Sequence, residues 1–288
     1  MRRVRNTVQI LIGVTAVVGG LAILAPAAQA ITIPVACSEN ALVAAVNLAN
    51  STPTADTLVL AGGCTYGMTT SHGGAANALP VITTPIEMIG PATVTNASLL
   101  ALGRFRIAEV GPTGSLTLTT GVAFTRGNVL GDGGGILNRG AVTLTGSTLT
   151  GNTASGNGGG LANADTPTGT APAATFTNSP VSGNTTLLGD GGGIYNGLRG
   201  TLTVTGVSGS PLFVTNNNAG RGGGISAVDS TATTLTQTAV TNNHALLLGT
   251  AGGVYRQGGV MTTTNAPITA NTPNNCVGSV PAVPNCTG

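Results

Sequence analysis

The chain has 288 residues, of which 6% are charged and 2% aromatic, and 46 of them are glycine. Its ten basic residues are all arginines, so it cannot contain a Walker A loop, which needs a lysine to bind nucleotide phosphates. It also lacks tryptophan, His-Glu-x-x-His and Cys-x-x-Cys motifs and, beyond its first residues, any basic cluster, so we expect no cofactor, no metal and no nucleic-acid partner.

Residues 1–30 have the pattern of a secretory signal peptide. Arg2, Arg3 and Arg5 form a basic start, 10–24 is apolar, and Ala28-Gln29-Ala30 matches an A-x-A cleavage site. The alternative is an uncleaved membrane anchor, although the apolar run is only about 15 residues long. Without its first three arginines the chain has seven against eight acidic residues, a net charge of −1. We therefore predict a secreted, extracellular protein whose mature part, 31–288, is one domain without a membrane segment.

The four cysteines of an exported chain indicate disulfides. Proximity in sequence favours a bridge between Cys37 and Cys64 in an N-terminal cap region (31–64), and one between Cys276 and Cys286 in a C-terminal tail (272–288). Other pairings and free thiols are the alternatives. Bridges at both ends would stabilise the terminal coils of a repeat protein, which have a neighbour on one side only.

The first element that we expect in the mature chain is a helix from Ser38 to Asn50. Ser38 is a suitable N-cap, and Glu39 suits the positive end of a helix. Apolar residues follow at helical spacing, at Leu42, Ala45, Val46 and Ala49. A single apolar face predicts a short helix that covers the open end of a β-stack. The next expected elements are strands at 57–60, 86–89, 105–110 and 115–120.

A glycine phrase then returns five times, as Gly-Gly-Gly-aliphatic in four copies and as Ala-Gly-Gly-Val in the fifth. The copies begin at Gly133, Gly158, Gly191, Gly222 and Ala251. Their starts differ by 25, 33, 31 and 29 residues. A period of about 30 residues is typical of a solenoid, in which each coil buries its apolar side chains by stacking on its neighbours.

Each repeat also contains a strand pattern of alternating residues. The aliphatic residue of the glycine phrase is followed by a Thr-apolar-Thr segment, such as 143–145, and by a closing Gly-Asn or Asn-Asn phrase that suits corners with positive φ. Three short strands per coil predict an all-β fold, a right-handed parallel β-helix of about eight or nine coils. Residues 206–211 are extra in one coil, and we expect them to form a loop.

Several segments resemble secreted bacterial β-helix proteins. Cys37-Ser38, Ala44-Ala45-Val46-Asn47 and Gly63-Cys64-Thr65-Tyr66 are similar to a CSLREA-type entry segment, with Glu39-Asn40 in place of its usual Leu-Arg. Gly-Gly-Gly-Ile-Tyr-Asn at 191–196 and the Thr-Leu-Thr-Val-Thr after it are similar to coils that include the polymorphic outer-membrane-protein repeat. The ending at 275–288 looks like that of actinobacterial members. The resemblance implies the fold, but the family has no single activity.

Equivalent residues of successive coils should form columns with a spacing of about 4.8 Å. The residue before each glycine phrase gives the column Asp132, Asn157, Asp190, Arg221 and Thr250. We expect Asp190 and Arg221 to be neighbours that can form an ion pair. Asp132 and Asp190 should lie about 9.6 Å apart, near the upper limit for the two carboxylates of an inverting glycosidase. The alternative is a row of solvated turn residues without a ligand.

A second column contains Tyr195 and Tyr255, whose rings could stack on sugars. Isolated exposed aromatic residues are the alternative. Together with Asp132, Asp190 and Arg221, the two tyrosines are our candidate ligand-binding residues. We assign no catalytic residue.

Three further patterns bear on function. Asn138, Asn163 and Asn196 form a column that we expect to be a structural ladder of side-chain amides. The Thr-x-Thr segments resemble the flat arrays of ice-binding β-solenoids, but their irregular neighbours and the extra segment at 206–211 argue against a continuous plane. Glu87 and Glu109, with Arg104 and Arg106, could line a groove like that of pectate lyases, which share the predicted fold, but no lyase motif can be matched to them.

We therefore predict an exported, non-catalytic β-helix protein that contacts a polysaccharide or another cell-surface component, or that has a structural role, and that is a monomer. A polysaccharide lyase or glycosidase is the main alternative. The sequence shows no convergent pair among its eight acidic residues, and such pairs are the usual basis of acid–base catalysis. Ice binding through the Thr-x-Thr rows is a minor alternative.

Overall fold

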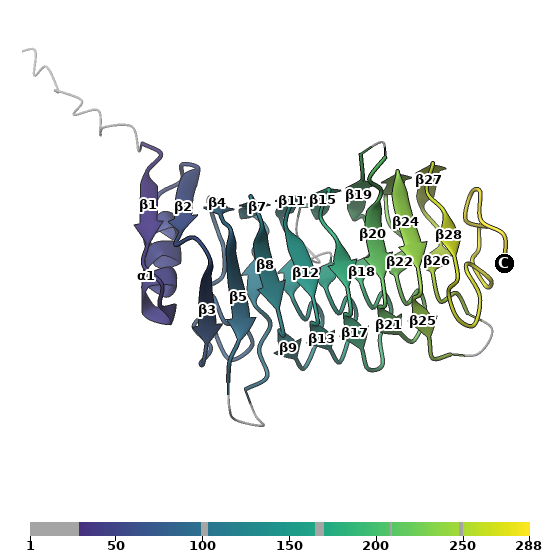
Figure 1. Cartoon of the computed structure of the whole chain (residues 1–288), viewed down its shortest axis with the longest axis horizontal. Coiled ribbons are helices and arrows are strands. Elements are labelled where there is room, and N and C mark those ends of the chain that lie inside the picture. Colours follow the sequence, from purple (N-terminus) through teal and green to yellow (C-terminus); the bar gives the residue numbers. More distant parts are fainter. Residues whose placement is uncertain (1–28, 99–102, 165–169, 208, 248–249) are drawn as a thin grey trace, which may run out of the picture.

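The computed structural model describes residues 29–98, 103–164, 170–207, 209–247 and 250–288, so most of the predicted signal peptide lies outside the described residues. The chain forms a parallel β-solenoid of about eight turns (Figure 1). Each strand pairs with the equivalent strand of the coil before or after it, and every pairing between named strands is parallel. The predicted all-β repeat fold is therefore confirmed.

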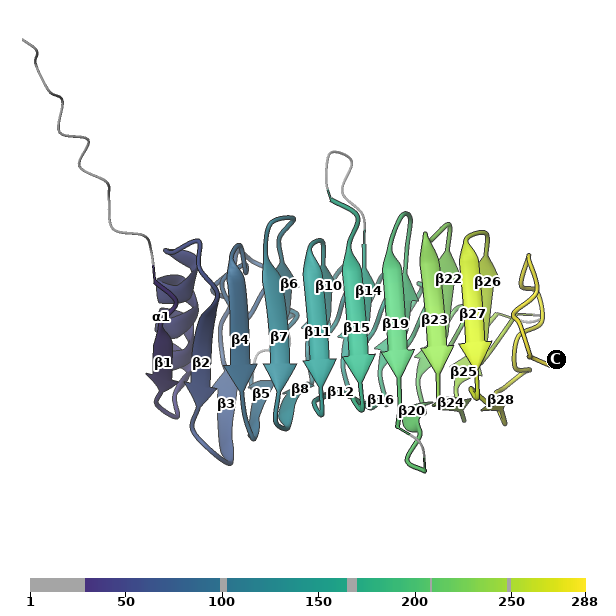
Figure 2. The same cartoon turned by 90° about the horizontal axis from the view of Figure 1, so that it is seen from above.

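The longest sheet has nine strands and runs the full length of the stack, with little change of direction from strand to strand (Figure 2). Its strands are β1 (Thr32–Val35), β2 (Asp56–Leu60), β4 (Pro85–Ile89), β7 (Ser115–Thr119), β11 (Ala141–Thr145), β15 (Ala173–Thr177), β19 (Thr201–Thr205), β23 (Ala232–Thr236) and β27 (Val260–Thr264).

Three shorter sheets complete the coil. The eight-stranded sheet comprises β3 (Cys64–Met68), β5 (Ala92–Asn96), β8 (Val122–Thr125), β12 (Thr148–Thr150), β16 (Val181–Ser182), β20 (Leu212–Thr215), β24 (Thr238–Thr241) and β28 (Ile268–Thr269). The six-stranded sheet comprises β6 (Ala108–Val110), β10 (Ile136–Asn138), β14 (Leu161–Asn163), β18 (Ile194–Asn196), β22 (Ile225–Val228) and β26 (Val254–Gln257). The five-stranded sheet comprises β9 (Asn128–Val129), β13 (Thr153–Ala154), β17 (Thr185–Thr186), β21 (Asn218–Ala219) and β25 (His244–Ala245).

The middle coils thus contain four strands, and the expectation of three was wrong. The missed strands are those of the five-stranded sheet, each only two residues long. A strand of two residues has one inward side chain, such as Val129 or Ala154, and therefore has no alternation that could be recognised in the sequence.

Alternation does produce the core of the longer strands. In β7, β11, β15, β19 and β23 the second and fourth residues are buried and the flanking residues half-buried or exposed. The inner column Leu118, Leu144, Phe176, Val204 and Leu235 is in register and fully buried. At about 25 cal/mol per Å² of buried apolar surface, such columns are the main stabilising term of each coil.

The predicted position of the helix in the sequence is confirmed by α1 (Glu39–Asn50). The Ser38 side chain accepts a hydrogen bond from the Ala41 amide at 3.2 Å, and the four predicted apolar residues are the buried ones. The helix lies at the N-terminal end of the stack beside β1 and β2 (Figure 1). The two predicted cysteine pairs are also confirmed, with Cα–Cα distances of 5.7 Å for Cys37–Cys64 and 6.4 Å for Cys276–Cys286.

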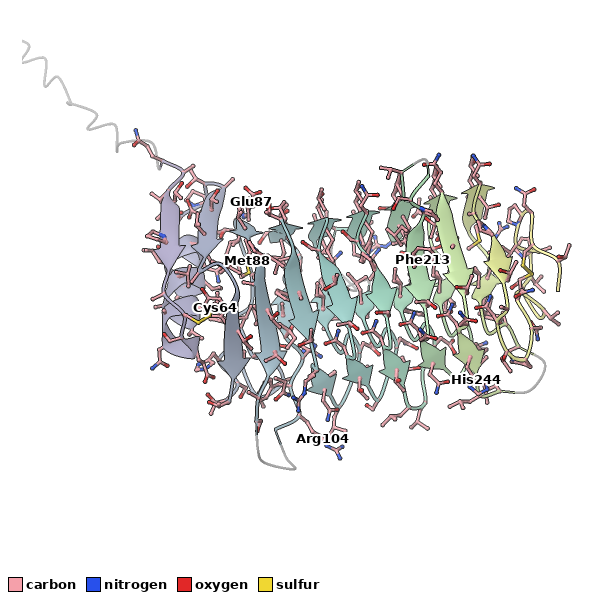
Figure 3. The ribbon with its side chains drawn as sticks, in the orientation of Figure 1. Cys64, Glu87, Met88, Arg104, Phe213 and His244 are labelled. Atoms are coloured by element: carbon pink, nitrogen blue, oxygen red, sulfur yellow. A yellow bond between two sulfur atoms is a disulfide. The ribbon has the colours of Figure 1, made fainter. Side chains whose placement is uncertain are left out.

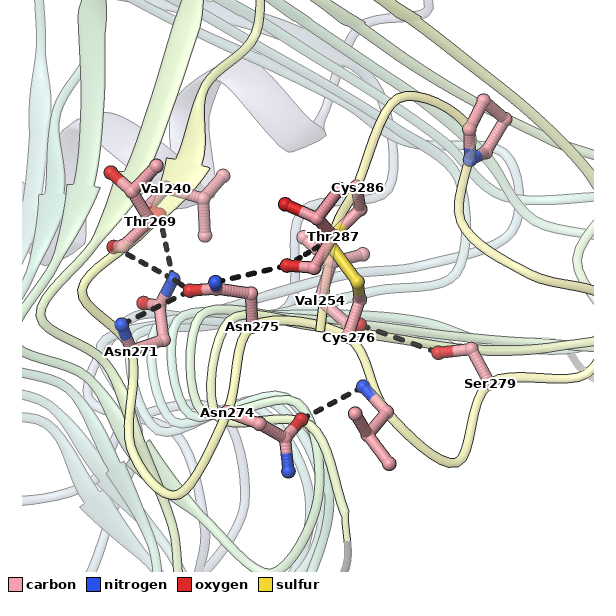
Figure 4. Close-up of a disulfide and its surroundings, with 12 residues drawn as sticks. Val240, Val254, Thr269, Asn271, Asn274, Asn275, Cys276, Ser279, Cys286 and Thr287 are labelled. Carbon is pink, nitrogen blue, oxygen red and sulfur yellow. Dashed lines mark hydrogen bonds between the residues drawn. A yellow bond between two sulfur atoms is a disulfide. The ribbon is translucent and has the colours of Figure 1, made fainter.

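Both residues of each closing phrase were expected to suit corners with positive φ. This expectation is confirmed for the first residue, but the second residue has a different role. Positive φ angles occur at the first residue, as at Gly151 (64°) and Asn216 (56°). The second residue is buried and forms a side-chain ladder from coil to coil. Its members are Asn152, Asn184, Asn217, Asn243 and Asn271. The ladder ends on Asn275, beside the Cys276–Cys286 bridge (Figure 4).

Candidate functional site

The outer side of the nine-stranded sheet carries two unbroken threonine columns, which we call the threonine face. The strands from β7 to β27 are in register, so each column has one threonine from each of six coils. One column is Thr117, Thr143, Thr175, Thr203, Thr234 and Thr262; the other is Thr119, Thr145, Thr177, Thr205, Thr236 and Thr264. All twelve side chains are half-buried or exposed.

The extra residues 206–211 were expected to interrupt the plane of the threonine face. They do not, so this expectation was wrong. Strand β19 is complete and pairs with β15 and β23 over all five residues. The extra residues come after β19, in the turn to β20, where Val207 and Ser210 form an antiparallel bridge. The insertion therefore lies at a corner between two sheets and leaves the plane of the threonine columns intact.

The threonine face is also chemically uniform. From β7 to β27 its third outward column is Ser115, Ala141, Ala173, Thr201, Ala232 and Val260, so no charged or aromatic residue belongs to it. Among the described residues, the only hydrogen bond made by a hydroxyl of the two threonine columns joins Thr119 to Glu87 of β4, at 3.3 Å. The other hydroxyls are available to solvent or to a ligand.

A second candidate surface comprises the outer side of the six-stranded sheet, which carries Tyr195 and Tyr255, and the turns before its strands, which carry Asp132, Asp190 and Arg221. The Arg221 guanidinium binds Asp190 through two hydrogen bonds, of 3.1 and 2.6 Å, which confirms the expected neighbours. Asp132 and Asp190 are separated by the coil of Asn157, as predicted. The Asp132 carboxylate accepts from the Asn157 amide at 2.6 Å, and the Asn157 side chain accepts from the Asp190 amide at 2.9 Å. This column therefore ties each coil to the next.

The two tyrosines are less accessible than a sugar-stacking site requires. Tyr255 is only 8% exposed, and the Arg221 guanidinium lies over its ring at 4.7 Å from the centroid. Tyr195 is half-buried, and its ring lies against Gly197, where an added Cβ would meet it at 2.7 Å. Burial, followed by the charges of Asp190, Asp132 and Asp229, raises the pKa of Tyr195, which therefore keeps its proton at neutral pH.

Between the two tyrosines lies a polar atom that sequence reasoning did not single out. Ser226 pairs in register with Tyr195 on one side and with Tyr255 on the other. It is fully buried, and its hydroxyl has no hydrogen-bond partner. Such a group costs free energy unless a partner is supplied. The asparagine column beside this surface is the expected ladder, with amide contacts of 2.7 Å from Asn138 to Asn163 and 2.8 Å from Asn163 to Asn196.

The four residues considered for a lyase-like groove do not line one groove. Glu87 is on β4 of the nine-stranded sheet, whereas Glu109 is on β6 of the six-stranded sheet. Figure 3 shows Glu87 and Arg104 at opposite edges of the molecule. Arg106 is buried and contacts Glu109 at 3.4 Å, and Arg139 contacts the same carboxylate at 3.3 Å. Burial lowers the pKa of Arg106, and the Glu109 charge opposes this shift.

The acidic residues of the described chain are likewise distributed rather than gathered. No three His, Cys, Asp or Glu residues of the described segments lie close enough together to hold a metal ion. A hollow of about 330 Å³ beside β9 is lined by neutral side chains and by Arg126. Within the described segments, no helix is long and apolar enough to cross a membrane.

No family model matches this chain. The searches of curated proteins and of solved structures return no match either. The fold is therefore established by the geometry of the chain itself, and the resemblance to CSLREA-type and polymorphic outer-membrane proteins stays an expectation.

Proposed function

We propose that the chain is an exported, non-catalytic scaffold that binds ice through its threonine face. The observation that carries this proposal is the pair of six-residue threonine columns in register from β7 to β27, six strands whose outward side chains include no charge and no aromatic ring. The two disulfides support an oxidising, extracellular location.

Regular spacing makes the face suitable for an ordered water lattice. Outward residues of a strand recur about every 6.8 Å, and neighbouring coils lie about 4.8 Å apart. Each position presents one methyl group and one hydroxyl that can donate and accept hydrogen bonds. The restricted χ1 angle of threonine and the pairing of the strands keep this array rigid, so little conformational entropy is lost on binding.

The test is thermal hysteresis and inhibition of ice recrystallisation by the purified protein. Thr175 lies on β15, near the middle of the face, and a Thr175→Lys substitution would place a long charged side chain there. We expect it to remove most of the activity. Thr148→Lys is the matched control, because Thr148 is an equally half-buried outward threonine on β12 of the eight-stranded sheet. Absence of activity in the unmodified protein would refute the proposal.

A second candidate function is polysaccharide binding by the six-stranded sheet. The unpartnered hydroxyl of Ser226 between Tyr195 and Tyr255 supports it, because a sugar hydroxyl that displaced one ring would supply the missing partner. A panel of plant and bacterial polysaccharides tests it, scored for binding and for the release of reducing sugar. Binding that is weakened by Ser226→Ala would support this function, because alanine removes the hydroxyl that the sugar is proposed to bind. Cleavage would instead support the lyase or glycosidase and contradict a non-catalytic scaffold.

A further inference from the structure

Exposed leucines are concentrated along one edge of the molecule, outside the surfaces described above. Seven leucines of the described chain are exposed, and five of them follow strands of the five-stranded sheet. They are Leu130, Leu187, Leu188, Leu246 and Leu247, with exposed fractions of 65, 55, 87, 52 and 52%. The strands that precede them, from β9 to β25, form a row at the edge of the stack (Figure 1). A grouped apolar surface of this kind marks an interaction site more often than single exposed leucines do.

The leucines alternate with small residues from coil to coil. The register of the five-stranded sheet, continued past the strand ends, places Leu130, Ser155 and Leu187 in one column, and Leu246 lies above Gly220 two coils further on. In the coil of β21, Gly220 follows Ala219 directly and its amide donates to Gly189, so this coil has no residue opposite Leu187 and Leu188. Backbone hydrogen bonds support this continuation: the Ser155 amide donates to Val129, that of Leu187 to Ala154 and that of Leu246 to Ala219. Leu188 and Leu247 widen the column at the same coils that already carry a leucine. We call these seven residues the leucine ridge.

The small positions are true gaps between the leucines. Gly220 has no side chain and is buried. The Ser155 hydroxyl turns back to accept a hydrogen bond from the Gly131 amide at 2.8 Å. Leucines therefore recur every second coil, about 9.6 Å apart, with a gap midway between them.

We propose that the leucine ridge is the interface of a homodimer, in which the leucines of one copy fill the gaps of the other. A two-fold axis perpendicular to the column and midway between two of its central coils moves two of the three leucine levels onto the two gap levels, and the third leucine level falls just beyond the end of the partner's ridge. The ridge is thus complementary to itself, as an interface between identical subunits must be. This inference is independent of the proposed ice binding, and it replaces the monomer that the sequence suggested.

The surroundings of the ridge suit such a contact. The neighbouring outward column consists of Asn128, Thr153, Thr185, Asn218 and His244, so no acidic or arginine side chain lies in it. The border on the other side is the column of Asp132, Asn157, Asp190 and Arg221, whose charges include the Asp190–Arg221 ion pair. An apolar centre with a polar rim is the usual composition of a protein interface. Five coils span only about 19 Å, so the contact is at the small end of specific interfaces, and we expect a reversible dimer.

Sedimentation equilibrium of the purified protein over a range of concentrations tests the dimer. Leu187 is the central leucine, and Leu187→Ser should weaken dimerisation by tenfold or more, about 1.4 kcal/mol. Leu198→Ser is the matched control, because Leu198 is equally exposed (56% against 55%) but lies between β18 and β19. A protein that is monomeric at every concentration, or a dimer that Leu187→Ser leaves unchanged, would overturn the proposal.

Two substitutions of Ser155 distinguish interdigitation from simple apolar adhesion. Both Ser155→Ala and Ser155→Leu remove the hydrogen bond to Gly131, but only leucine fills the gap. If the leucines interdigitate, Ser155→Ala leaves the dimer close to its original strength and Ser155→Leu weakens it, although leucine makes the surface more apolar. A tighter dimer of the Ser155→Leu protein would contradict the proposed geometry. Thermal unfolding of both variants verifies that they remain folded.

Discussion

Two kinds of polar column run along this solenoid, and they differ in how their hydrogen bonds are satisfied. The inner column is the asparagine ladder from Asn152 to Asn271, in which each side chain bonds to the next coil and to a backbone carbonyl. The outer columns are those of the threonine face, whose hydroxyls make a single hydrogen bond within the described chain, from Thr119. Both repeat once per coil, and both consist of one residue type.

The difference shows that repetition alone does not identify a binding surface. A column whose groups are already paired contributes to folding, because removing one member leaves buried partners unsatisfied. A column whose groups are free contributes little to folding and can be used for recognition. On this criterion the carboxylates of Asp132 and Asp190 resemble the asparagine ladder, since both accept hydrogen bonds from the next coil. The threonine face does not resemble the ladder, because its hydroxyls are not paired in this way.

The largest effect is expected inside the ladder, from Asn217→Ala. The Asn217 side chain accepts from the backbone and side-chain amides of Asn184 and donates to Val181 and to Asn243. Its removal leaves buried groups unpaired, at a cost of about 3 kcal/mol or more in the free energy of unfolding. Denaturant unfolding measures this. Asn218→Ala is the control: this neighbouring residue faces outward on β21, and its loss should cost well under 1 kcal/mol. Equal losses would remove the distinction between the two kinds of column.

A smaller effect is expected at the end of the ladder, where the C-terminal tail holds the last member. Asn271 donates to the Asn275 side chain at 3.1 Å, next to Cys276 (Figure 4). Replacing Cys276 and Cys286 by serine opens a loop of 10 residues, which should cost about 2.7 kcal/mol in the chain-entropy model. In this double serine variant, hydrogen exchange should be faster at the Asn271 amide than at the Asn184 amide. Uniform exchange along the ladder would mean that the tail does not protect its end.

At the opposite end, a polar cluster should make stability depend on pH. Glu39 of α1 accepts hydrogen bonds from Thr69, Thr70 and His72. Partial burial alone would raise its pKa, but these hydrogen bonds outweigh burial and lower the pKa from 4.5 to about 2. A lowered carboxyl pKa stabilises the fold above pH 4.5, and this contribution is lost as the pH falls toward 2.

Melting temperatures of the unmodified protein and of Glu39→Gln between pH 6 and pH 2 measure this contribution. The unmodified protein should melt at the higher temperature at pH 6, and the difference should shrink below pH 4.5. A difference that stays constant down to pH 2 would show that the Glu39 carboxylate is not the titrating group. The cluster resembles the asparagine ladder in that its polar groups satisfy each other.

Much of the fold could be predicted from the sequence because apolar alternation and glycine spacing report directly on stacking. The Asp190–Arg221 contact was expected on that basis. The helix was expected from its Ser38 N-cap and helical apolar spacing, and both cysteine pairs were expected from their proximity in sequence. The fourth strand of the middle coils could not be predicted, because a strand of two residues is too short to show an alternating pattern. The burial of Tyr255 under Arg221 and the free hydroxyl of Ser226 could not be predicted either, because they depend on side-chain directions that the sequence does not specify.

The smallest effect on stability is expected on the threonine face, from Thr203→Val. Valine keeps the shape, the methyl group and the strand preference of threonine and removes only a hydroxyl that has no partner in the described chain. The free energy of unfolding should therefore change by less than about 0.5 kcal/mol. Ice recrystallisation inhibition should decrease only partly and less than with Thr175→Lys, because one hydroxyl of the array is lost and its plane is kept. A loss of stability like that of Asn217→Ala would mean that the threonine hydroxyls are bonded within the fold. The face would then be scaffold, like the asparagine ladder.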